Sequence, residues 1–274
     1  MADMPPYLSP SSASVFTGCP RRWRFKYIDR LSDPSGRAAL VGTFAHRVLE
    51  LLCQGSPEER TLDQAKELAR NAWDEFAATD DYVNLELDQD EARAFRWQAW
   101  LAIAGLWDIE DPAGVDVVST EQKIQVELGS VPFVGIIDRV DRIGGELVVS
   151  DYKSGTLPGH RWRQEKIQQV MLYAAALAGH TGQRPSRARL LYLGQRVLDV
   201  RVTQSRIDDA LAKLSEAWTE IDKACGRDEF EPRPSVLCGW CPFVAECPEG
   251  RAELLSRADA GRLPAHAPSA ALVA

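Results

Sequence analysis

The 274-residue sequence contains no apolar run near the roughly 20 residues that a membrane-spanning helix needs. Its first ten residues have neither the basic start nor the apolar stretch of a secretory signal, so we predict a cytoplasmic protein. The chain lacks a Gly-x-x-x-x-Gly-Lys-Ser/Thr motif, which excludes a P-loop helicase within it. No internal repeat is visible, and 45% hydrophobic with 26% charged residues is typical of an ordinary globular protein.

Charge is unevenly distributed along a chain whose formal net charge is −8. Residues 54–121 contain 17 acidic and 5 basic side chains, a balance of −12, whereas residues 139–196 contain 10 basic and 4 acidic side chains, a balance of +6. The overall acidity argues against a protein that coats nucleic acid indiscriminately, but it allows one basic groove on an acidic body. The alternative is that these charges are the solvated faces of helices.

Apolar periodicity predicts an α/β protein. Helical spacing indicates helices over residues 9–18, 40–52, 62–76, 91–107, 167–177 and 206–224. Alternating or β-branched segments indicate strands over residues 115–118, 123–128, 133–143, 146–152, 188–193 and 197–202. We divide the chain into N-terminal helices (1–53), a helical insertion (54–112) with a loop at Asp80-Asp81, an α/β core (113–225), a cysteine-rich segment (226–256) and a disordered tail (257–274).

Two carboxylates and a lysine are expected to meet at neighbouring strand ends. Asp138 lies near the end of one predicted strand, Asp151 ends the next, and a Gly-Gly turn joins the two. Because side chains alternate along a strand, Asp151 and Lys153 point to the same face. Two carboxylates would bind Mg²⁺ or Mn²⁺, and the lysine would orient a metal-activated water and stabilise charge on phosphorus. The alternative is a set of surface salt bridges at strand ends.

Four motifs in order resemble the PD-(D/E)XK nuclease superfamily, and specifically its RecB-like exonuclease branch. They are Gly42–His46, Gly135–Asp141, Asp151–Gly155 and Gln169–Tyr173, and the resemblance covers about residues 8–247. It implies a restriction-endonuclease-like core over residues 113–225, with a mixed central β-sheet flanked by helices.

The resemblance also implies roles for individual residues. Asp138 and Asp151 would be metal ligands, Lys153 the catalytic lysine, and His46 an additional metal ligand on a helix. Gln169 and Tyr173 would line the active site from the following helix. Two further predictions come from the residues and not from the resemblance. Tyr152 would offer its backbone carbonyl to the metal, because its side chain should point away from the site, and Glu121, which precedes a predicted strand, could approach the same ion.

The remaining motif is a group of cysteines. Cys238 and Cys241 form a C-x-x-C pair, followed by Cys247, and three thiolates in a short loop indicate a metal site. Cys19 lies in a predicted loop before a proline and is the candidate fourth ligand, whereas Cys53 and Cys225 are interpreted as buried thiols. Spacing leaves both zinc and an iron–sulfur cluster open.

Some RecB-like nucleases carry a 4Fe-4S cluster, namely the AddB-type helicase–nuclease subunits and the CRISPR adaptation nucleases. By resemblance to them, Cys19, Cys238, Cys241 and Cys247 would hold such a cluster as a clasp between the N- and C-terminal segments. Zinc is the alternative.

The sequence therefore predicts a Mg²⁺- or Mn²⁺-dependent deoxyribonuclease, more an exonuclease than an endonuclease, acting on single strands or DNA ends. We expect it to serve DNA repair, recombination or processing, with a helicase or repair complex as a possible partner. The segments 21–26 and 160–163, rich in arginine and aromatic residues, are expected DNA contacts, and the alternative is packing at helix ends with the arginine head groups in solvent. The alternatives are a non-catalytic DNA-binding subunit with an iron–sulfur or zinc site, and a zinc-ribbon interaction protein, which would leave the carboxylates unexplained.

Overall fold

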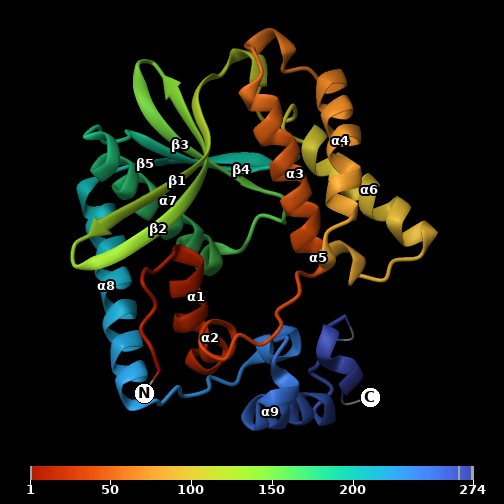
Figure 1. The fold of residues 1–274 in the computed structure, drawn as a ribbon, viewed down its shortest axis with the longest axis vertical. Coiled ribbons are helices and arrows are strands. Elements are labelled where there is room, and N and C mark those ends of the chain that lie inside the picture. Colours follow the sequence, from red (N-terminus) through yellow and green to blue (C-terminus); the bar gives the residue numbers. More distant parts are fainter. Residues whose placement is uncertain (1, 265, 273–274) are drawn as a thin grey trace. The chain divides into compact units, whose positions relative to one another are not determined.

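The structure, a computed structural model, describes residues 2–264 and 266–272, and the side chains of residues 160–162 lie outside its description. The chain divides into two compact units (Figure 1). The sheet unit is Ser35–Ala212, and the terminal unit combines Met1–Pro34 with Lys213–Ala274. Among the described residues, every helix is too short or too polar to cross a membrane.

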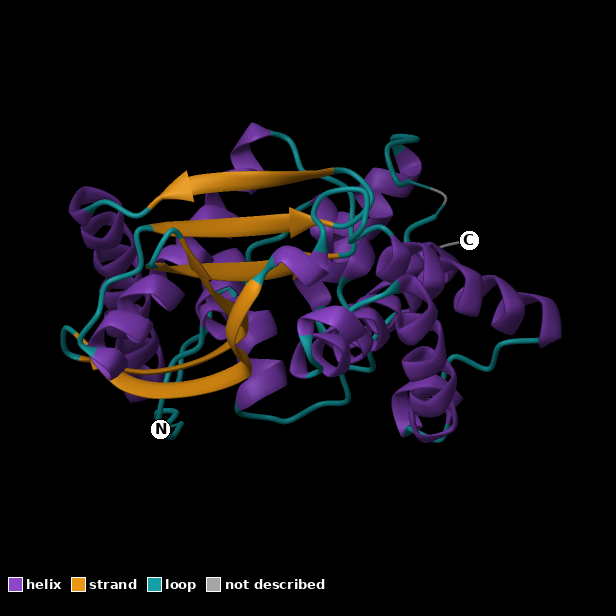
Figure 2. Cartoon of the chain, turned by 90° about the horizontal axis from the view of Figure 1, so that it is seen from above, coloured by secondary structure: helices purple, strands orange, loops and turns teal. Residues whose placement is uncertain are grey.

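The sheet unit is built on five strands in the spatial order of the chain, drawn in orange in Figure 2. β3 and β4 are parallel, and all other neighbours are antiparallel. The bounds are β1 (Asp116–Leu128), β2 (Val131–Ile143), β3 (Glu146–Lys153), β4 (Arg187–Tyr192) and β5 (Arg196–Arg201). The predicted α/β class and mixed sheet are confirmed. The segments 115–118 and 123–128, predicted as separate strands, form the single strand β1.

Helices cover this sheet and form the insertion. They are α3 (Arg37–Gln54), α4 (Leu62–Ala77), α5 (Asp80–Val83), α6 (Gln89–Ala104) and α7 (His160–Thr181), with short 3₁₀ turns at Pro57–Glu59 and Pro112–Gly114. α7 packs on β1, β2 and β4, and α3 packs on β1 and β2. The loop predicted at Asp80-Asp81 was wrong, because the Thr79 hydroxyl accepts the amide of Tyr82 and caps a short helix there.

The terminal unit is formed by both ends of the chain. It contains α1 (Pro10–Gly18), α2 (Pro20–Tyr27), α9 (Pro248–Asp259) and 3₁₀ turns at Val236–Trp240, Val244–Glu246 and Pro268–Leu272. α8 (Gln204–Arg227) runs through the boundary between the units. The predicted disordered tail contains the end of α9 and the last 3₁₀ turn, while residues 265 and 273–274 lie outside the described residues, so its disorder stays a prediction.

The segment 21–26, which was expected to contact DNA, makes packing and ion-pair contacts within the terminal unit. Trp23 is fully buried, stacks on Phe230 at a 5.9 Å centroid distance, and donates its indole N–H to Ser12 Oγ at 2.9 Å. It therefore cannot stack on a base. Arg24 pairs with Asp228 at 3.0 Å. The interpretation of this segment as packing, rather than as a DNA contact, fits the structure better.

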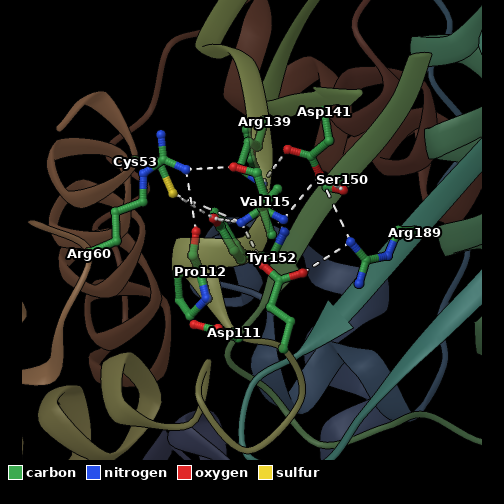
Figure 3. A network of polar contacts seen from close by, with 12 residues as sticks. Cys53, Arg60, Asp111, Pro112, Val115, Arg139, Asp141, Ser150, Tyr152 and Arg189 are labelled. Atoms are coloured by element: carbon green, nitrogen blue, oxygen red, sulfur yellow. Dashed lines mark hydrogen bonds and ion pairs between the residues drawn. The ribbon is translucent and has the colours of Figure 1, made fainter. Parts of the chain in front are cut away.

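A buried charge network joins the strands of the sheet unit (Figure 3). Arg139, fully buried, pairs through Nε with Asp141 Oδ1 at 2.7 Å and through Nη1 with Glu110 Oε1 at 2.6 Å. It also donates to the hydroxyl of Tyr152 at 2.8 Å. Arg189 pairs with the other oxygen of Glu110 at 3.0 Å. Burial alone would raise the pKa of Glu110, but Arg139 and then Arg189 outweigh burial and lower it.

Because Arg139 is fully buried and pairs with two buried carboxylates, Arg139→Ala should destabilise the protein by about 3–5 kcal/mol. The measurement is urea denaturation beside Arg187→Ala, whose exposed pair with Asp199 at 2.8 Å should be worth less than about 1 kcal/mol. Equal losses for the two variants would contradict a structural role for the network.

Candidate functional site

Asp138 and Asp151 lie where β2 and β3 separate. The ladder between the two strands ends at the pair Arg139–Ser150, and each aspartate is the next residue beyond this pair on its strand. Beyond it, the amide of Tyr152 donates to Asp138 Oδ2 at 2.7 Å, in place of a bond between the strands. The opening of the ladder leaves both carboxylates at one end of the sheet.

Lys153 lies on the same side of β3 as Asp151, as the alternation of side chains predicts. Its ammonium forms an ion pair with Asp151 Oδ2. The side chain of Asp151 is 3% exposed and that of Lys153 19% exposed. Burial alone would lower the pKa of Lys153, but the carboxylates of Asp151 and Asp138 outweigh burial and raise it, so the lysine stays protonated.

α3 brings His46 to the two aspartates. His46 Nδ1 lies 3.4 Å from Asp138 Oδ2, and its ring packs edge-on against the ring of Tyr152, with centroids 5.7 Å apart. One turn earlier, a Cβ on Gly42 would lie 2.7 Å from Ser154 Oγ. Glycine at position 42 therefore allows α3 to approach the segment that follows β3 and presents His46 to the site.

Glu121 joins this group from β1. Its φ of +44° places it in the left-handed region, which is uncommon for a residue with a side chain and marks a local distortion of the strand. Ligand atoms of His46, Glu121 and Asp138 all lie within 4.8 Å of one another. Carboxylates suit Mg²⁺ and Mn²⁺, and the added imidazole suits transition metals, so these residues could hold a divalent ion.

The charges of the site are costly in the metal-free protein. Burial and then Asp151 raise the pKa of Asp138 well above its usual range. Burial, Glu50 and Asp151 raise the pKa of Glu121 to about 7. Burial lowers the pKa of His46, which favours the neutral ring that binds metals. A divalent cation would relieve the repulsion among these groups.

The side chains of Gln169 and Tyr173 lie one turn apart on α7. Gln169 Oε1 accepts from Lys153 Nζ at 3.5 Å, and Gln169 Nε2 donates to the Tyr173 hydroxyl at 3.0 Å. The Tyr173 ring lies over Gly135, where a Cβ would come within 2.9 Å of it. These contacts hold Lys153 from the helix side.

An open cleft of ≈ 830 Å³ runs along this end of the sheet. Its lining includes the predicted residues His46, Tyr152 and Lys153, together with Arg47, Glu50, Lys166 and Tyr192, which sequence reasoning missed. Lys166 lies three residues before Gln169, and that helical spacing could have indicated it. Tyr192 enters through the pairing of β4 with β3, which no local pattern reveals.

The four predicted cysteines lie together in the terminal unit. Cys19, Cys238, Cys241 and Cys247 line one pocket. Backbone amides donate to three of the sulfurs: Arg233 N to Cys19 at 3.4 Å, Ser235 N to Cys238 at 3.4 Å, and Gly250 N to Cys247 at 3.3 Å. The structure therefore brings these residues together.

The two remaining cysteines are buried elsewhere, as predicted. Cys53 lies in the sheet unit, with its sulfur 3.5 Å from the Tyr152 hydroxyl. Cys225 lies in the terminal unit and does not line the cysteine pocket. The roles assigned to the individual site residues stay predictions.

Comparisons with known proteins agree with this geometry. The family described as the PD-(D/E)XK nuclease superfamily matches residues 7–248 of the chain. The Gene 69 protein of Mycobacterium phage L5 is 25% identical over 286 residues, covering 89% of this chain and 96% of the relative. The Gene 69 protein of Mycobacterium phage D29 is 26% identical over 272 residues, with 89% and 97% covered.

A solved structure shares the fold. It is that of a candidate exonuclease from Eubacterium rectale, and it covers 88% of each chain with a TM-score of 0.56 and 16% sequence identity. Because the identity is this low, the likeness concerns the fold alone.

The raised pKa of Glu121 predicts how pH acts on the metal-free protein. Glu121 is protonated more easily when folded than when unfolded, so its stabilising contribution is present below about pH 4.5 and lost as pH rises through about 7. In the presence of a chelator, Glu121→Gln should lose less free energy of unfolding than wild type across this window. Added Mn²⁺ should stabilise wild type near neutral pH and the variant less.

Glu127→Gln, an exposed change on the same strand, is the control and should behave like wild type. If Glu121→Gln and wild type show parallel pH profiles of unfolding free energy and equal stabilisation by Mn²⁺, Glu121 neither has a raised pKa nor binds the metal.

Proposed function

Because the chain belongs to the PD-(D/E)XK nuclease superfamily, we propose that it hydrolyses phosphodiester bonds of DNA with Mg²⁺ or Mn²⁺. One observation carries this proposal: carboxylates, an imidazole and an ion-paired lysine from four elements converge at the opening of the β2–β3 ladder, beside a cleft. A set of surface salt bridges would not be enclosed in this way.

His46, Glu121, Asp138 and Asp151 would hold the metal, with the backbone carbonyl of Tyr152 as a further ligand. The bound ion would supply a water of lowered pKa and neutralise charge on the phosphate. Lys153, protonated by its pairing with Asp151, would donate to the attacking water or the phosphate oxygen and stabilise negative charge there. Gln169, fixed by Tyr173, would keep the Lys153 ammonium in position.

We propose exonuclease action on single strands or DNA ends. The chain carries no P-loop with which to unwind a duplex, so its substrates would be ends or strands that another enzyme exposes. A helicase or repair complex is the kind of partner that would supply them, in repair, recombination or DNA processing. The Eubacterium rectale protein of similar fold is named as a candidate exonuclease, which agrees with this mode.

We further propose that Cys19, Cys238, Cys241 and Cys247 hold a 4Fe-4S cluster in a RecB-like arrangement. Four thiolates from one pocket suit either a zinc ion or a 4Fe-4S cluster, and the resemblance to RecB-like nucleases that carry such a cluster favours the cluster. The three amide donors to sulfur are of the kind that tune such clusters.

The nuclease proposal predicts that Lys153→Ala lowers the rate of digestion at least about 10²-fold, since it removes the cation that faces the developing charge. The assay uses an end-labelled single strand with Mn²⁺. Lys123→Ala, an exposed lysine on β1, is the control and should cut at the wild-type rate. Substrates with both ends blocked should resist an exonuclease. Undiminished cutting by Lys153→Ala would place the activity elsewhere.

The cluster proposal predicts a brown protein, when purified without oxygen, that contains iron and acid-labile sulfide in equal amounts. Cys238→Ser should lose the colour and the iron, because it removes a thiolate of the pocket, whereas Cys225→Ala should keep both. Colourless protein with one zinc ion per chain would overturn the iron–sulfur assignment and favour zinc.

A further inference from the structure

The end of the cleft beside Lys153 contains a hydroxyl without a use in the mechanism above. Tyr192 is 2% exposed, and its hydroxyl is buried with no hydrogen-bond partner among the described residues. In the parallel ladder Tyr192 is paired with Lys153, so the two side chains stand next to each other on one face. Buried polar groups in folded proteins normally have partners, so an unsatisfied hydroxyl on a residue that lines a cleft has a hydrogen bond to offer to a ligand or a water.

A cation of α7 lines the same cleft as Tyr192. Lys166 lines the same cleft and has no ion pair with any side chain that the structure describes. Loss of hydration, and then the ammonium of Lys153, lower the pKa of Lys166, so an anion bound there would be stabilising. Burial raises the pKa of Tyr192 and outweighs the opposing effect of the Lys153 ammonium and, more weakly, of Arg163, so the phenol stays protonated.

The cleft is lined by charges of both signs. Arg47, Glu50 and Glu121 line it together with Lys153, Lys166 and Tyr192, and Tyr192 is the ladder partner of Lys153. All three of these latter groups are hydrogen-bond donors, and two are cationic. A phosphate, whose oxygens only accept, is the ligand class that satisfies them.

We propose that Tyr192 and Lys166 form a second phosphate subsite, which binds the phosphate next to the scissile one on the strand being cut. This inference rests on the proposed nuclease function. The Tyr192 hydroxyl and the Lys166 ammonium donate to the neighbouring phosphate and fix the register of the strand, which places the scissile phosphate between Lys153 and the metal ligands. A free phosphate ion has the same chemistry, so the test separates it from a DNA phosphate.

The experiment measures binding of fluorescent single-stranded oligonucleotides to the full chain, with Ca²⁺ in place of Mn²⁺ so that binding is followed without relying on cleavage. Each oligonucleotide carries one uncharged methylphosphonate at a different position. Wild type should lose about tenfold in affinity at the position that the subsite reads. Tyr192→Phe and Lys166→Gln should bind unmodified DNA about tenfold more weakly and be indifferent to that position.

Lys123→Gln, which removes a lysine outside the cleft, should keep the wild-type pattern. If both variants respond to every methylphosphonate as wild type does, or if wild type binds no DNA, the subsite is overturned. Competition by inorganic phosphate without any position dependence would assign the site to a free ion instead. Should Tyr192→Phe fail to fold, Lys166→Gln carries the test.

Cleavage with Mn²⁺ is scored separately. A wild type that reads one methylphosphonate through Tyr192 and Lys166 yet cuts nothing would overturn the nuclease proposal while supporting a DNA-phosphate subsite. If wild type cuts DNA but both variants show the wild-type response to every methylphosphonate, the nuclease proposal is supported and the subsite is overturned.

Discussion

The ion pair of Arg139 with Asp141 lies on one face of β2, where charges are paired and buried, while the other face carries the charges of the candidate site. Arg139 and Asp141 point to the buried side, where their charges are balanced within the protein. Asp138, one residue away, points to the other side and meets His46 and the Asp151–Lys153 pair. Side chains alternate along a strand. A shift of one residue in the pairing of β2 would therefore turn Arg139 and Asp141 toward the site and Asp138 toward the buried network.

The neighbouring strand repeats this division. Ser150 donates to Asp141 at 2.6 Å, and the Tyr152 hydroxyl accepts from Arg139, both on the buried side. Asp151 and Lys153 alternate with them and face the cleft. The buried network therefore fixes the backbone from which the site residues project. The groups of this network have their charges paired, so the strands tolerate the repulsion that raises the pKa values of Asp138 and Glu121 on the other face.

Much of this arrangement could be read from the sequence because it depends on local patterns. Strand alternation and the Gly144-Gly145 turn predicted that Asp138, Asp151 and Lys153 meet, and the order of four motifs predicted the superfamily, which is confirmed. The RecB-like branch, the iron–sulfur cluster and the individual roles stay predictions. The structure groups the three closely spaced cysteines Cys238, Cys241 and Cys247 with Cys19, which was expected from its loop context and from the resemblance.

The features that sequence reasoning missed depend on contacts between distant segments or on backbone geometry. Tyr192 reaches the cleft only through the parallel pairing of β3 with β4, and the parallel ladder leaves no periodic signal of its partner. Glu121 was expected near the metal, but nothing in the sequence indicated the left-handed backbone conformation that accompanies its approach to His46 and Asp138. Trp23 looked available for stacking because its neighbours are basic, yet it is the centre of an aromatic core.

The terminal unit is assembled from Met1–Pro34 and Lys213–Ala274, so its first segment lacks its partner segment until the ribosome has synthesised the residues after Ala212. Ser35–Ala212 is contiguous, and during synthesis it can fold before the C-terminal segment emerges. Trp23 and Cys19 therefore lack their contacts with the C-terminal segment while the sheet forms. Biogenesis of this protein has an order that its chain connectivity imposes, with the cysteine pocket completed last.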